Sequence, residues 1–380
     1  MDKPYYVILT GGKNNAGDYL IGSQIKSLLK SIRPDRDVYE LDAWSNKDQN
    51  ELELINGSMC LILAGGPSLQ PGMASNIYNL SNILEDINVP ITMMGVGWHH
   101  ERGYQSDIGA INLDSETIKL LKRVDSTGFP ASVRDYHTQK LLFSYGFKNN
   151  TMTGCPVLYS KTSDSSTNCK AQNKVVFSLG VSHKHSRLMT KSMKELIVMA
   201  RDQFSDSEFL VAFHHSIDKK YLDSPSASKQ LYKRHIEFKN WLNRNRLKFV
   251  DISGSERELI SLYDSASVHI GYRVHAHIYM TSQSKPSFLL AEDGRGLALK
   301  EVLGGAVFHA FSSYKVNSIF TKLRRFGINI ELYRPDYSLY RWFFDLIENE
   351  LSGKSMMCLQ SHRRVNELYS KMSEFLRSLP

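Results

Sequence analysis

A chain of 380 residues is long enough for two or three domains of ordinary size. Hydrophobic residues make up 42% of it and charged residues 23%, which excludes a disordered or collagen-like chain. The four cysteines are too few for a disulfide framework and show no C-x-x-C spacing, so a zinc knuckle is not expected. No run of 18 apolar residues occurs, and the first apolar run is too short for a signal sequence, so we expect a cytoplasmic protein.

Positive charge is concentrated in the second part of the chain. The net charge is +8, but residues 1–160 carry 14 Lys and Arg against 17 Asp and Glu, whereas residues 161–380 carry 33 against 22. This excess favours an anionic partner such as a phosphate, a carboxylate or a membrane surface, although solvated Lys-rich helices such as 229–248 account for part of it. No basic block with interleaved aromatic residues occurs, so nucleic acid is not an expected partner.

Short apolar runs alternate with helical patterns through the first 160 residues. We predict strands at 5–9, 60–63, 91–94 and 131–133, a helix over 19–29 and another through Lys140 and Leu142. Buried strands separated by helices indicate a parallel sheet with helices on both faces.

The polar segment 160–174 is typical of an interdomain linker, and the alternation resumes after it. We predict strands at 175–179, 209–213, 248–250, 268–270 and 287–290, and helices around 190–204, 226–245, 256–264, 337–351 and 360–378. The expected fold is α/β, with two Rossmann-like domains that face a cleft and C-terminal helices that pack back across them. The expected boundaries are 1–165, 172–335 and 336–380.

Glycines follow three predicted strands of the first domain. Asn15-Ala16-Gly17-Asp18 opens the first helix, and Gly65-Gly66 and Gly95-Val96-Gly97 follow the next two strands. In open parallel sheets, ligands bind beyond the carboxyl ends of strands, where bare backbone N–H groups meet them. A tight turn with an Asn15 cap explains the first motif equally well, but three such ends in one domain favour a ligand site.

Several common nucleotide and nucleophile motifs do not occur. There is no G-x-G-x-x-G after the first strand, no G-x-x-x-x-G-K-[ST] and no G-x-S-x-G. Their absence argues against a dinucleotide oxidoreductase, a P-loop nucleotidase and the usual α/β-hydrolase.

The strand at 268–270 runs into Gly271-Tyr272-Arg273-Val274-His275-Ala276-His277. A guanidinium there can hold a carboxylate or phosphate in bidentate fashion, and the nearby imidazole can act as a general acid or base near neutral pH. Packing alone explains His277, whereas a functional role is favoured for Arg273 and His275. No carboxylate lies at ligand spacing from the histidines, so we expect no metal site.

Three other residues follow predicted strands or turns. Arg134 is a second cation at a strand end, although Asp135 next to it explains the pair as an ion pair and a helix cap. Cys155 is expected to be a small buried residue rather than a nucleophile. Glu292 follows the strand at 287–290 beside the expected cleft, and a solvent-exposed turn explains it equally well.

In chain order these segments resemble the polysaccharide pyruvyl transferase family over about residues 7–295. The matching pieces are Asn15-x-Gly17-Asp18, Gly65-Gly66-x-x-Leu69, Gly95-x-Gly97, Val133-Arg134-Asp135, Gly154-Cys155-Pro156, Gly271-x-Arg273-Val274-His275-Ala276 and Lys285-Pro286. Members of that family are similar to two-domain glycosyltransferases of the GT-B architecture. The resemblance implies transfer of an enolpyruvyl unit from phosphoenolpyruvate to two hydroxyls of a sugar, which yields a pyruvate ketal and phosphate without a cofactor.

The resemblance also implies roles for individual residues. Arg134 and Arg273 would hold the phosphate and carboxylate of the donor, and His275 would protonate its methylene carbon. Gly271 and Glu292 would complete the donor side. The implied acceptor-side residues are Asn15, Asp18, Gly65, Gly66, Trp98 and His99. The expected partners are an anionic small-molecule donor and a saccharide acceptor, with peripheral membrane contact if the acceptor is a lipid-linked glycan.

This sequence departs from the family pattern in two places, and two alternatives remain open. Pro67 follows Gly65-Gly66 where the family often has a glycine, and Trp98, His99 and His100 replace small and apolar residues, so the acceptor is undetermined. One alternative is a GT-B glycosyltransferase that uses a sugar nucleotide and binds its ribose through Glu292. The other is a non-catalytic carbohydrate- or anion-binding protein.

Overall fold

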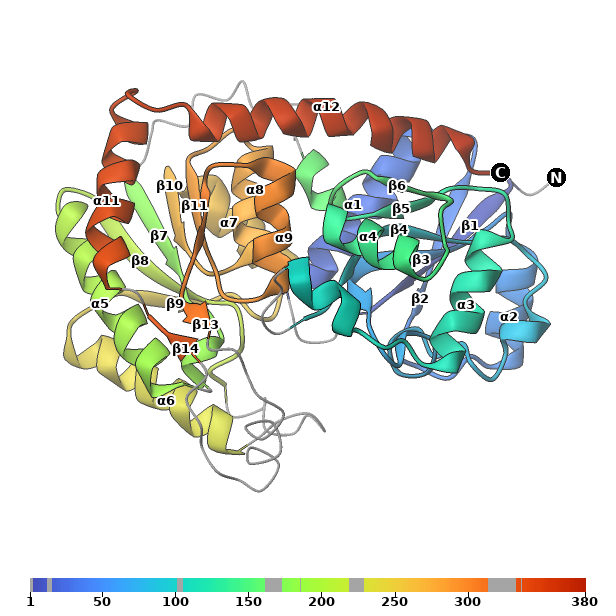
Figure 1. Ribbon diagram of the computed structural model, residues 1–380, viewed down its shortest axis with the longest axis horizontal. Coiled ribbons are helices and arrows are strands. Elements are labelled where there is room, and N and C mark those ends of the chain that lie inside the picture. Colours follow the sequence, from blue (N-terminus) through green and yellow to red (C-terminus); the bar gives the residue numbers. More distant parts are fainter. Residues whose placement is uncertain are drawn as a thin grey trace.

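The computed structural model describes residues 3–11, 16–100, 105–160, 173–184, 186–218, 229–313, 333–335 and 337–380. Over these residues the chain forms two six-stranded sheets, each made of parallel strands with helices packed around them (Figure 1). The predicted α/β class is therefore confirmed. The expected boundaries at 165 and 172 remain a prediction, because residues 161–172 of the expected linker lie outside the described residues.

The first sheet has the strand order β2-β1-β3-β4-β5-β6. Its strands are β1 (Tyr5–Thr10), β2 (Asp37–Asp42), β3 (Leu61–Leu69), β4 (Ile91–Trp98), β5 (Ala131–Val133) and β6 (Asn150–Met152). Its helices are α1 (Ala16–Ile32), α2 (Gln49–Asn56), α3 (Ser115–Asp125) and α4 (Tyr136–Ser144), with a short 3₁₀ turn, η4 (Pro156–Tyr159), after the last strand.

The second sheet has the strand order β12-β11-β10-β7-β8-β9. Its strands are β7 (Lys174–Ser178), β8 (Glu208–Phe213), β9 (Phe249–Asp251), β10 (Val268–Gly271), β11 (Ser287–Ala291) and β12 (Val307–His309). Its helices are α5 (Arg187–Gln203), α6 (Lys229–Arg244), α7 (Glu256–Ser265), α8 (Val274–Ser282) and α9 (Gly294–Leu303), with the 3₁₀ turn η5 (Ser182–Lys184) before α5. The short strands β13 (Ser312–Ser313) and β14 (Tyr333–Arg334) pair in antiparallel fashion.

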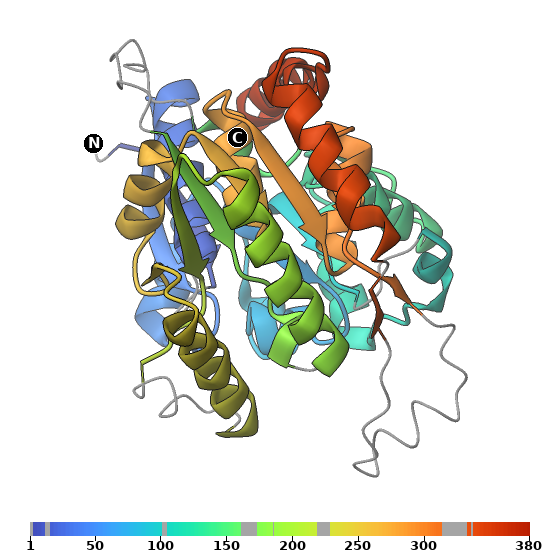
Figure 2. The ribbon, with the colours of Figure 1, turned by 90° about the vertical axis from the view of Figure 1, so that its left-hand side faces the viewer.

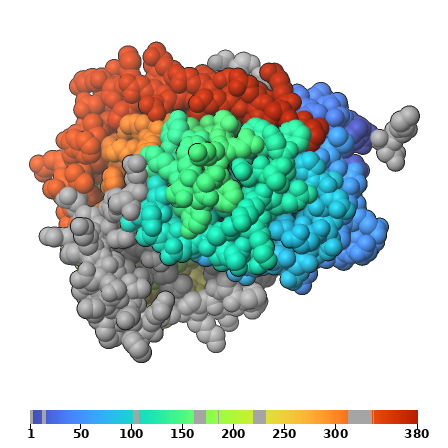
Figure 3. All heavy atoms as spheres, turned by 45° about the vertical axis from the view of Figure 1, so that its right-hand side comes forward, coloured from blue at the N-terminus to red at the C-terminus, as the bar shows by residue number. Residues whose placement is uncertain are grey.

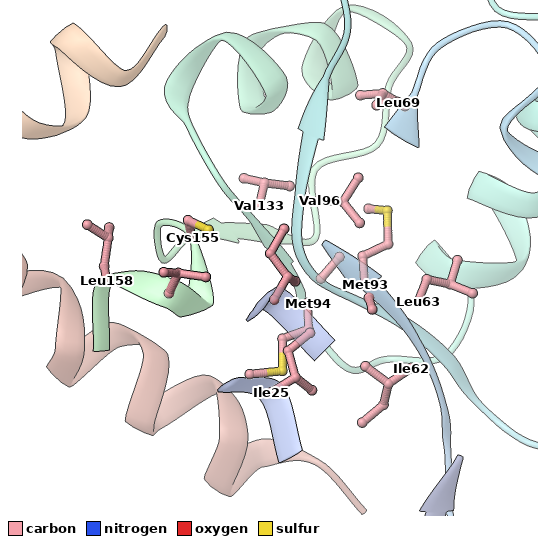
Figure 4. Packing of buried hydrophobic residues seen from close by; sticks show 14 of the residues in the cluster. Ile25, Ile62, Leu63, Leu69, Met93, Met94, Val96, Val133, Cys155 and Leu158 are labelled. Atoms are coloured by element: carbon pink, nitrogen blue, oxygen red, sulfur yellow. The ribbon is translucent and has the colours of Figure 1, made fainter. Parts of the chain in front are cut away.

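Hydrophobic side chains fill the space between each sheet and its helices. Figure 4 shows this core in the first half, where Ile25 of α1 packs near Ile62 of β3 and Met94 of β4, and Cys155 and Leu158 close the far side. Every residue of β4 is buried, as expected for a central strand of a parallel sheet that is covered on both faces.

One of the two C-terminal helices crosses from one half to the other. Helix α11 (Ser338–Leu351) packs on the second half, and α12 (Met357–Ser378) contacts α8 and α9 of the second half as well as α1 of the first. Figure 3 shows α12 as a red band along the surface over both halves. The chain end is fixed there, because the Tyr6 hydroxyl donates to the Pro380 carbonyl at 2.6 Å. The predicted return of the C-terminal helices across both halves is confirmed.

The edge strands β2, β6 and β12 were not predicted from the sequence. Two glycine motifs were expected after strands but lie within them. Strand β2 has no buried residue, and β6 and β12 have three residues each, so none produces a long apolar run. Gly65-Gly66 and Gly95-Val96-Gly97 lie inside β3 and β4 rather than beyond their ends. A Cβ on Gly65 would lie 2.6 Å from the Gly95 carbonyl oxygen, so these glycines let two central strands approach closely.

None of the helices in the described ranges is both long and apolar enough to cross a bilayer.

Candidate functional site

The site begins where the strand order of the second sheet reverses, between β7 and β10. Ligands of open α/β sheets bind beside such switch points. Gly271 ends β10 with φ of +138°, and a Cβ there would lie 2.3 Å from the Ser178 carbonyl oxygen of β7. The chain then turns, and the Arg273 backbone N–H donates to the Ser178 hydroxyl at 3.0 Å. The glycine therefore places Arg273 at the carboxyl end of both central strands.

His275 lies in the first turn of α8 and faces the other half of the molecule. A Cβ on Gly17 would lie only 1.9 Å from His275 Nδ1, so the imidazole packs directly on the backbone at the start of α1. The side chain is 8% exposed, and its Nε2 has no hydrogen-bond partner among the described residues. The ring thus carries one nitrogen that is buried and unengaged.

Arg134 reaches the same region from the first sheet. It follows β5, is 3% exposed and packs its guanidinium on Gly97, where a Cβ would lie 2.3 Å from the Arg134 Cζ. Its Nε donates to Asp135 Oδ2 at 3.3 Å, while its Nη2 is buried without a partner among the described residues. Asp135 also caps α4 by accepting from the Thr138 N–H at 2.8 Å. Asp135 thus forms both the ion pair with Arg134 and the helix cap expected from the sequence. The Nη2 of Arg134 remains a donor without a partner among the described residues.

The electrostatics of His275 show that the two halves bring their cations together. Burial, together with the positive charges of Arg295, Arg134 and Arg273, lowers the His275 pKa to about 3, with Asp293 acting in the opposite direction. One of these cations belongs to the first half and two to the second. His275 is therefore a neutral imidazole at pH 7 among three guanidinium groups.

Glu292 is buried and not part of a solvent-exposed turn, which corrects that interpretation. Its carboxylate accepts from the Val181 N–H at 2.9 Å and from the Ser182 N–H and hydroxyl at 3.0 and 2.7 Å. A Cβ on Gly180 would lie 2.4 Å from Glu292 Oε2, so the loop after β7 is wrapped around this carboxylate. Glu292 therefore holds the loop that carries η5 into the site.

Two further cations lie in the site and were not singled out from the sequence. The first is Arg295, whose Nε donates to Asp293 Oδ2 at 2.9 Å and whose pKa is raised chiefly by that carboxylate. The second is Lys184, which is buried; burial lowers its pKa to about 8, with Arg273 acting in the same direction and Glu292 against it. Arg295 could have been singled out from the sequence because it follows the strand β11, as site residues often do. Lys184 has no recognisable motif around it.

A chain of buried hydrogen bonds supports the Arg273 turn from behind. His269 joins the Ser178 hydroxyl at 2.8 Å to the Ser287 hydroxyl at 2.7 Å, and His277 Nδ1 lies 2.8 Å from the same Ser287 oxygen. His277 is fully buried, and burial lowers its pKa to about 3. Its position agrees with the packing role expected for it.

The implied acceptor-side residues are not gathered in one place. Asn15 lies outside the described residues, and Asp18 is close enough to Arg295 to raise its pKa. Gly65 and Gly66 lie within β3, as described above. Trp98 is fully buried and stacks on His100 with ring centroids 5.6 Å apart, so its ring is covered by protein rather than open to a sugar.

His99 and His100 lie where the first half meets α9. The His99 N–H donates to the Leu69 carbonyl at 3.2 Å, and its side chain is exposed. The His100 carbonyl accepts from the Gly294 N–H at 3.0 Å, which joins the end of β4 to the start of α9. Of the two implied acceptor residues at the end of β4, Trp98 is buried and His99 has an exposed side chain.

Neither a nucleophilic thiol nor a metal cluster is found in the described site. Cys155 is buried, and burial raises its pKa to about 11, so it is not an activated thiol. Within the described ranges, no group of three or more His, Cys, Asp or Glu side chains is placed to hold a metal ion.

Comparison with known proteins gives one clear match. A family model described as polysaccharide pyruvyl transferase matches residues 15–294, which include every site residue named above except Arg295. Comparison with curated proteins finds no match.

The chain is also similar in structure to several proteins of low sequence identity. One is the Methanocaldococcus jannaschii UDP-GlcNAc 2-epimerase in complex with UDP-GlcNAc and UDP, which is 12% identical in sequence. The matched region covers 80% of this chain and 87% of the epimerase, with a TM-score of 0.46. S. aureus MnaA with UDP is 9% identical, with 90% and 91% covered and a TM-score of 0.47. The wall teichoic acid polymerase TagF is 11% identical, with 97% and 84% covered and a TM-score of 0.42. Similarity at this level assigns no activity to this chain.

Proposed function

This chain belongs to the polysaccharide pyruvyl transferase family and is a transferase, and we propose that it moves an enolpyruvyl unit from phosphoenolpyruvate onto two hydroxyls of a sugar. The observation that carries the proposal is the convergence of Arg134 from one half with Arg273 and His275 from the other. The products are a pyruvate ketal on the glycan and inorganic phosphate.

The charge of the site suits a small, highly anionic donor. Phosphoenolpyruvate carries close to three negative charges, and guanidinium groups bind both phosphate and carboxylate through paired hydrogen bonds. Arg134 offers a buried Nη2 without a partner among the described residues, and burial lowers the pKa of Arg273, which a bound anion would offset. In this proposal Arg134 and Arg273 bind the donor, with Lys184 and Arg295 adding positive charge.

His275 is proposed as the acid that starts the reaction. Its unengaged Nε2 would carry the proton to the methylene carbon of the donor, leaving an oxocarbenium-like carbon that one sugar hydroxyl attacks. A second hydroxyl then attacks the same carbon as its C–O bond to phosphate breaks. Of the two hydroxyl protons released, one replaces the proton that His275 gave to the methylene carbon and the other leaves with the phosphate. The free imidazole is neutral, and the negative charge of a bound donor would raise its pKa toward the working range.

The sugar-nucleotide alternative gains no support from Glu292. That role needs a carboxylate free to accept from ribose hydroxyls, but the Glu292 oxygens already accept from Val181 and Ser182. We propose instead that Glu292 acts on the donor side by holding the β7–α5 loop in place.

The test is acceptor-dependent release of phosphate. The purified protein is incubated with phosphoenolpyruvate and a panel of β-linked hexosides, and phosphate is measured together with the mass of the glycan. Release that requires an acceptor, with a glycan mass gain of one pyruvate less one water, supports the proposal. Thermal stabilisation by nucleoside diphosphates without phosphate release would support a glycosyltransferase instead.

Turnover is also expected to survive removal of divalent metal. The proposal uses guanidinium groups and an imidazole, so EDTA should leave phosphate release unchanged. Loss of turnover with EDTA and recovery with a divalent ion would contradict it.

A further inference from the structure

A second basic site lies on the second half, apart from the residues proposed to bind the donor. Helices α5 and α6 run side by side there, as Figures 1 and 2 both show. Between them is a pocket of about 350 Å³, which we call the α5–α6 pocket. Its charged lining consists of Arg187, Lys194, Lys233, Arg234 and Glu237. Its volume is within the range of pockets that hold small ligands, roughly 300–1,000 Å³.

The cations of this pocket are not neutralised by neighbouring carboxylates. Four basic side chains face one acidic side chain. Helix α5 forms two ion pairs, Lys191 with Glu195 and Arg201 with Asp202, and among the residues that the structure describes no ion pair involves the four pocket cations. Burial lowers the pKa of Lys194, Arg244 acts in the same direction, and Glu237 of the pocket acts against them.

The pocket is joined directly to the donor side. Arg234 donates to the Lys184 carbonyl at 2.6 Å, and the charges of Arg273 and Glu292 both act on the pKa of Lys184. His183, adjacent in sequence, lines the pocket and lies 3.2 Å from His235 of α6. The loop between β7 and α5 therefore connects the α5–α6 pocket to the proposed donor site.

We propose that the α5–α6 pocket binds a phosphate ester or diphosphate group as a second anion site. Separate cations on two helices suit a tetrahedral anion with several acceptor oxygens, and charge-assisted hydrogen bonds to such oxygens are among the strongest in proteins. The group has two sources that share this chemistry: a phosphate carried by the sugar acceptor, or a free phosphate compound. Binding of an anion in this pocket does not depend on the proposed function. The idea that the phosphate belongs to the sugar acceptor does rest on the proposed function.

The first experiment measures binding of inorganic pyrophosphate by calorimetry without donor or acceptor. The Arg273→Gln variant removes the donor site and should still bind one pyrophosphate. The Arg187→Gln/Lys233→Gln variant in the same background should lose at least tenfold in affinity. Lys239→Gln is the matched control, because Lys239 lies on α6 over the Phe249 ring and outside the pocket. Equal affinity in all three proteins, or no saturable binding to Arg273→Gln, would overturn the proposal.

The second experiment distinguishes the two sources in the otherwise unaltered enzyme. If the acceptor carries the phosphate, Arg187→Gln/Lys233→Gln raises the KM of a phosphorylated acceptor at least tenfold and leaves the KM of the unphosphorylated sugar unchanged. If the source is free, pyrophosphate changes turnover of the wild type with an unphosphorylated sugar and not that of the double variant. Pyrophosphate binding to the pocket with no turnover on any acceptor would refute the proposed function and leave the anion site standing.

Discussion

Arg273 is the residue on which donor recognition depends most in this account. Charge-assisted hydrogen bonds contribute roughly 1.5–3 kcal/mol each, and 1.4 kcal/mol is a factor of about ten in binding. Arg273→Ala is therefore expected to raise the donor KM by about tenfold to a hundredfold. Arg273→Lys should rescue only part of this loss, because lysine keeps the charge but loses the paired donors.

Steady-state phosphate release measures this effect, with circular dichroism as the check that the variants fold. The backbone N–H of Arg273, which bonds to Ser178, is retained in both variants. A donor KM within twofold of wild type in a folded Arg273→Ala protein would remove Arg273 from the donor site.

The protonation of His275 should respond to Arg295. Burial and then Arg295 are the leading causes of its lowered pKa, and Asp293 acts in the opposite direction. Replacing Arg295 by Gln removes one positive charge and leaves Asp293 without its ion-pair partner, so both effects raise the His275 pKa. NMR titration of the imidazole protons, assigned with His275→Gln, measures the shift. An unchanged or lower pKa would show that the cations do not surround His275.

At the scale of elements, the start of α1 packs against the His275 imidazole, which is proposed as the acid. In Gly17→Ala the new Cβ would meet His275 Nδ1 at 1.9 Å, so the ring or the helix must move. We expect kcat to fall at least tenfold while the unfolding temperature changes little, since misplacement of a reacting group by about 1 Å can cost a hundredfold in rate. Gly109→Ala is the matched control, because nothing lies within 4 Å of a Cβ there. If Gly17→Ala is as active as Gly109→Ala, the start of α1 does not position the His275 ring for the reaction.

The sequence predicts the central strands but misses three of the four edge strands, for a physical reason. Central strands such as β4 are buried on both faces and stand out as apolar runs, whereas β2 has no buried residue and β6 has three residues. The same limit applies to the site. Arg273 and His275 follow a central strand, which is why the sequence singles them out as candidates, while Lys184 is placed by a loop that folds around the distant carboxylate of Glu292.

Glycines show why a motif's place in the sequence does not fix its function. Gly17 and Gly97 pack on His275 and Arg134, so their lack of a Cβ serves the site. Gly65 serves the pairing of β3 with β4 instead. The sequence cannot separate these cases, because what a Cβ would meet belongs to another strand or to the other half.

For the whole molecule, the many buried histidines predict low stability in acid. Burial lowers the pKa of His275 and His277 to about 3 and of His235 to about 4, and lowers those of His214 and His269 well below their usual value. These groups are neutral in the folded protein but take up protons in the unfolded chain below about pH 6.5. Their contribution is therefore fully present above that pH and is lost as the pH falls from about 6.5 toward 3.

Each such histidine should lower the free energy of unfolding by up to about 1.4 kcal/mol per pH unit within that window. Urea unfolding at pH 7.5, 5.5 and 5.0 measures the slope. The His277→Gln variant removes one of these groups. Its free energy of unfolding should therefore change less steeply with pH than that of the wild type, by about that amount per pH unit. A wild-type free energy of unfolding that is constant from pH 7.5 to 5 would contradict the buried neutral histidines.

The central claim is that His275, placed between guanidinium groups from both halves, supplies the proton for pyruvyl transfer. The most direct test is acceptor-dependent phosphate release by His275→Gln, with donor binding measured on the same preparation and His277→Gln as control. Loss of a general acid typically costs about 10²–10⁴ in rate, so kcat should fall by that factor while the donor Kd stays within a few-fold and His277→Gln stays near wild type. A near-normal kcat in His275→Gln would contradict the account, and a large loss in His277→Gln alone would move the acid to that residue.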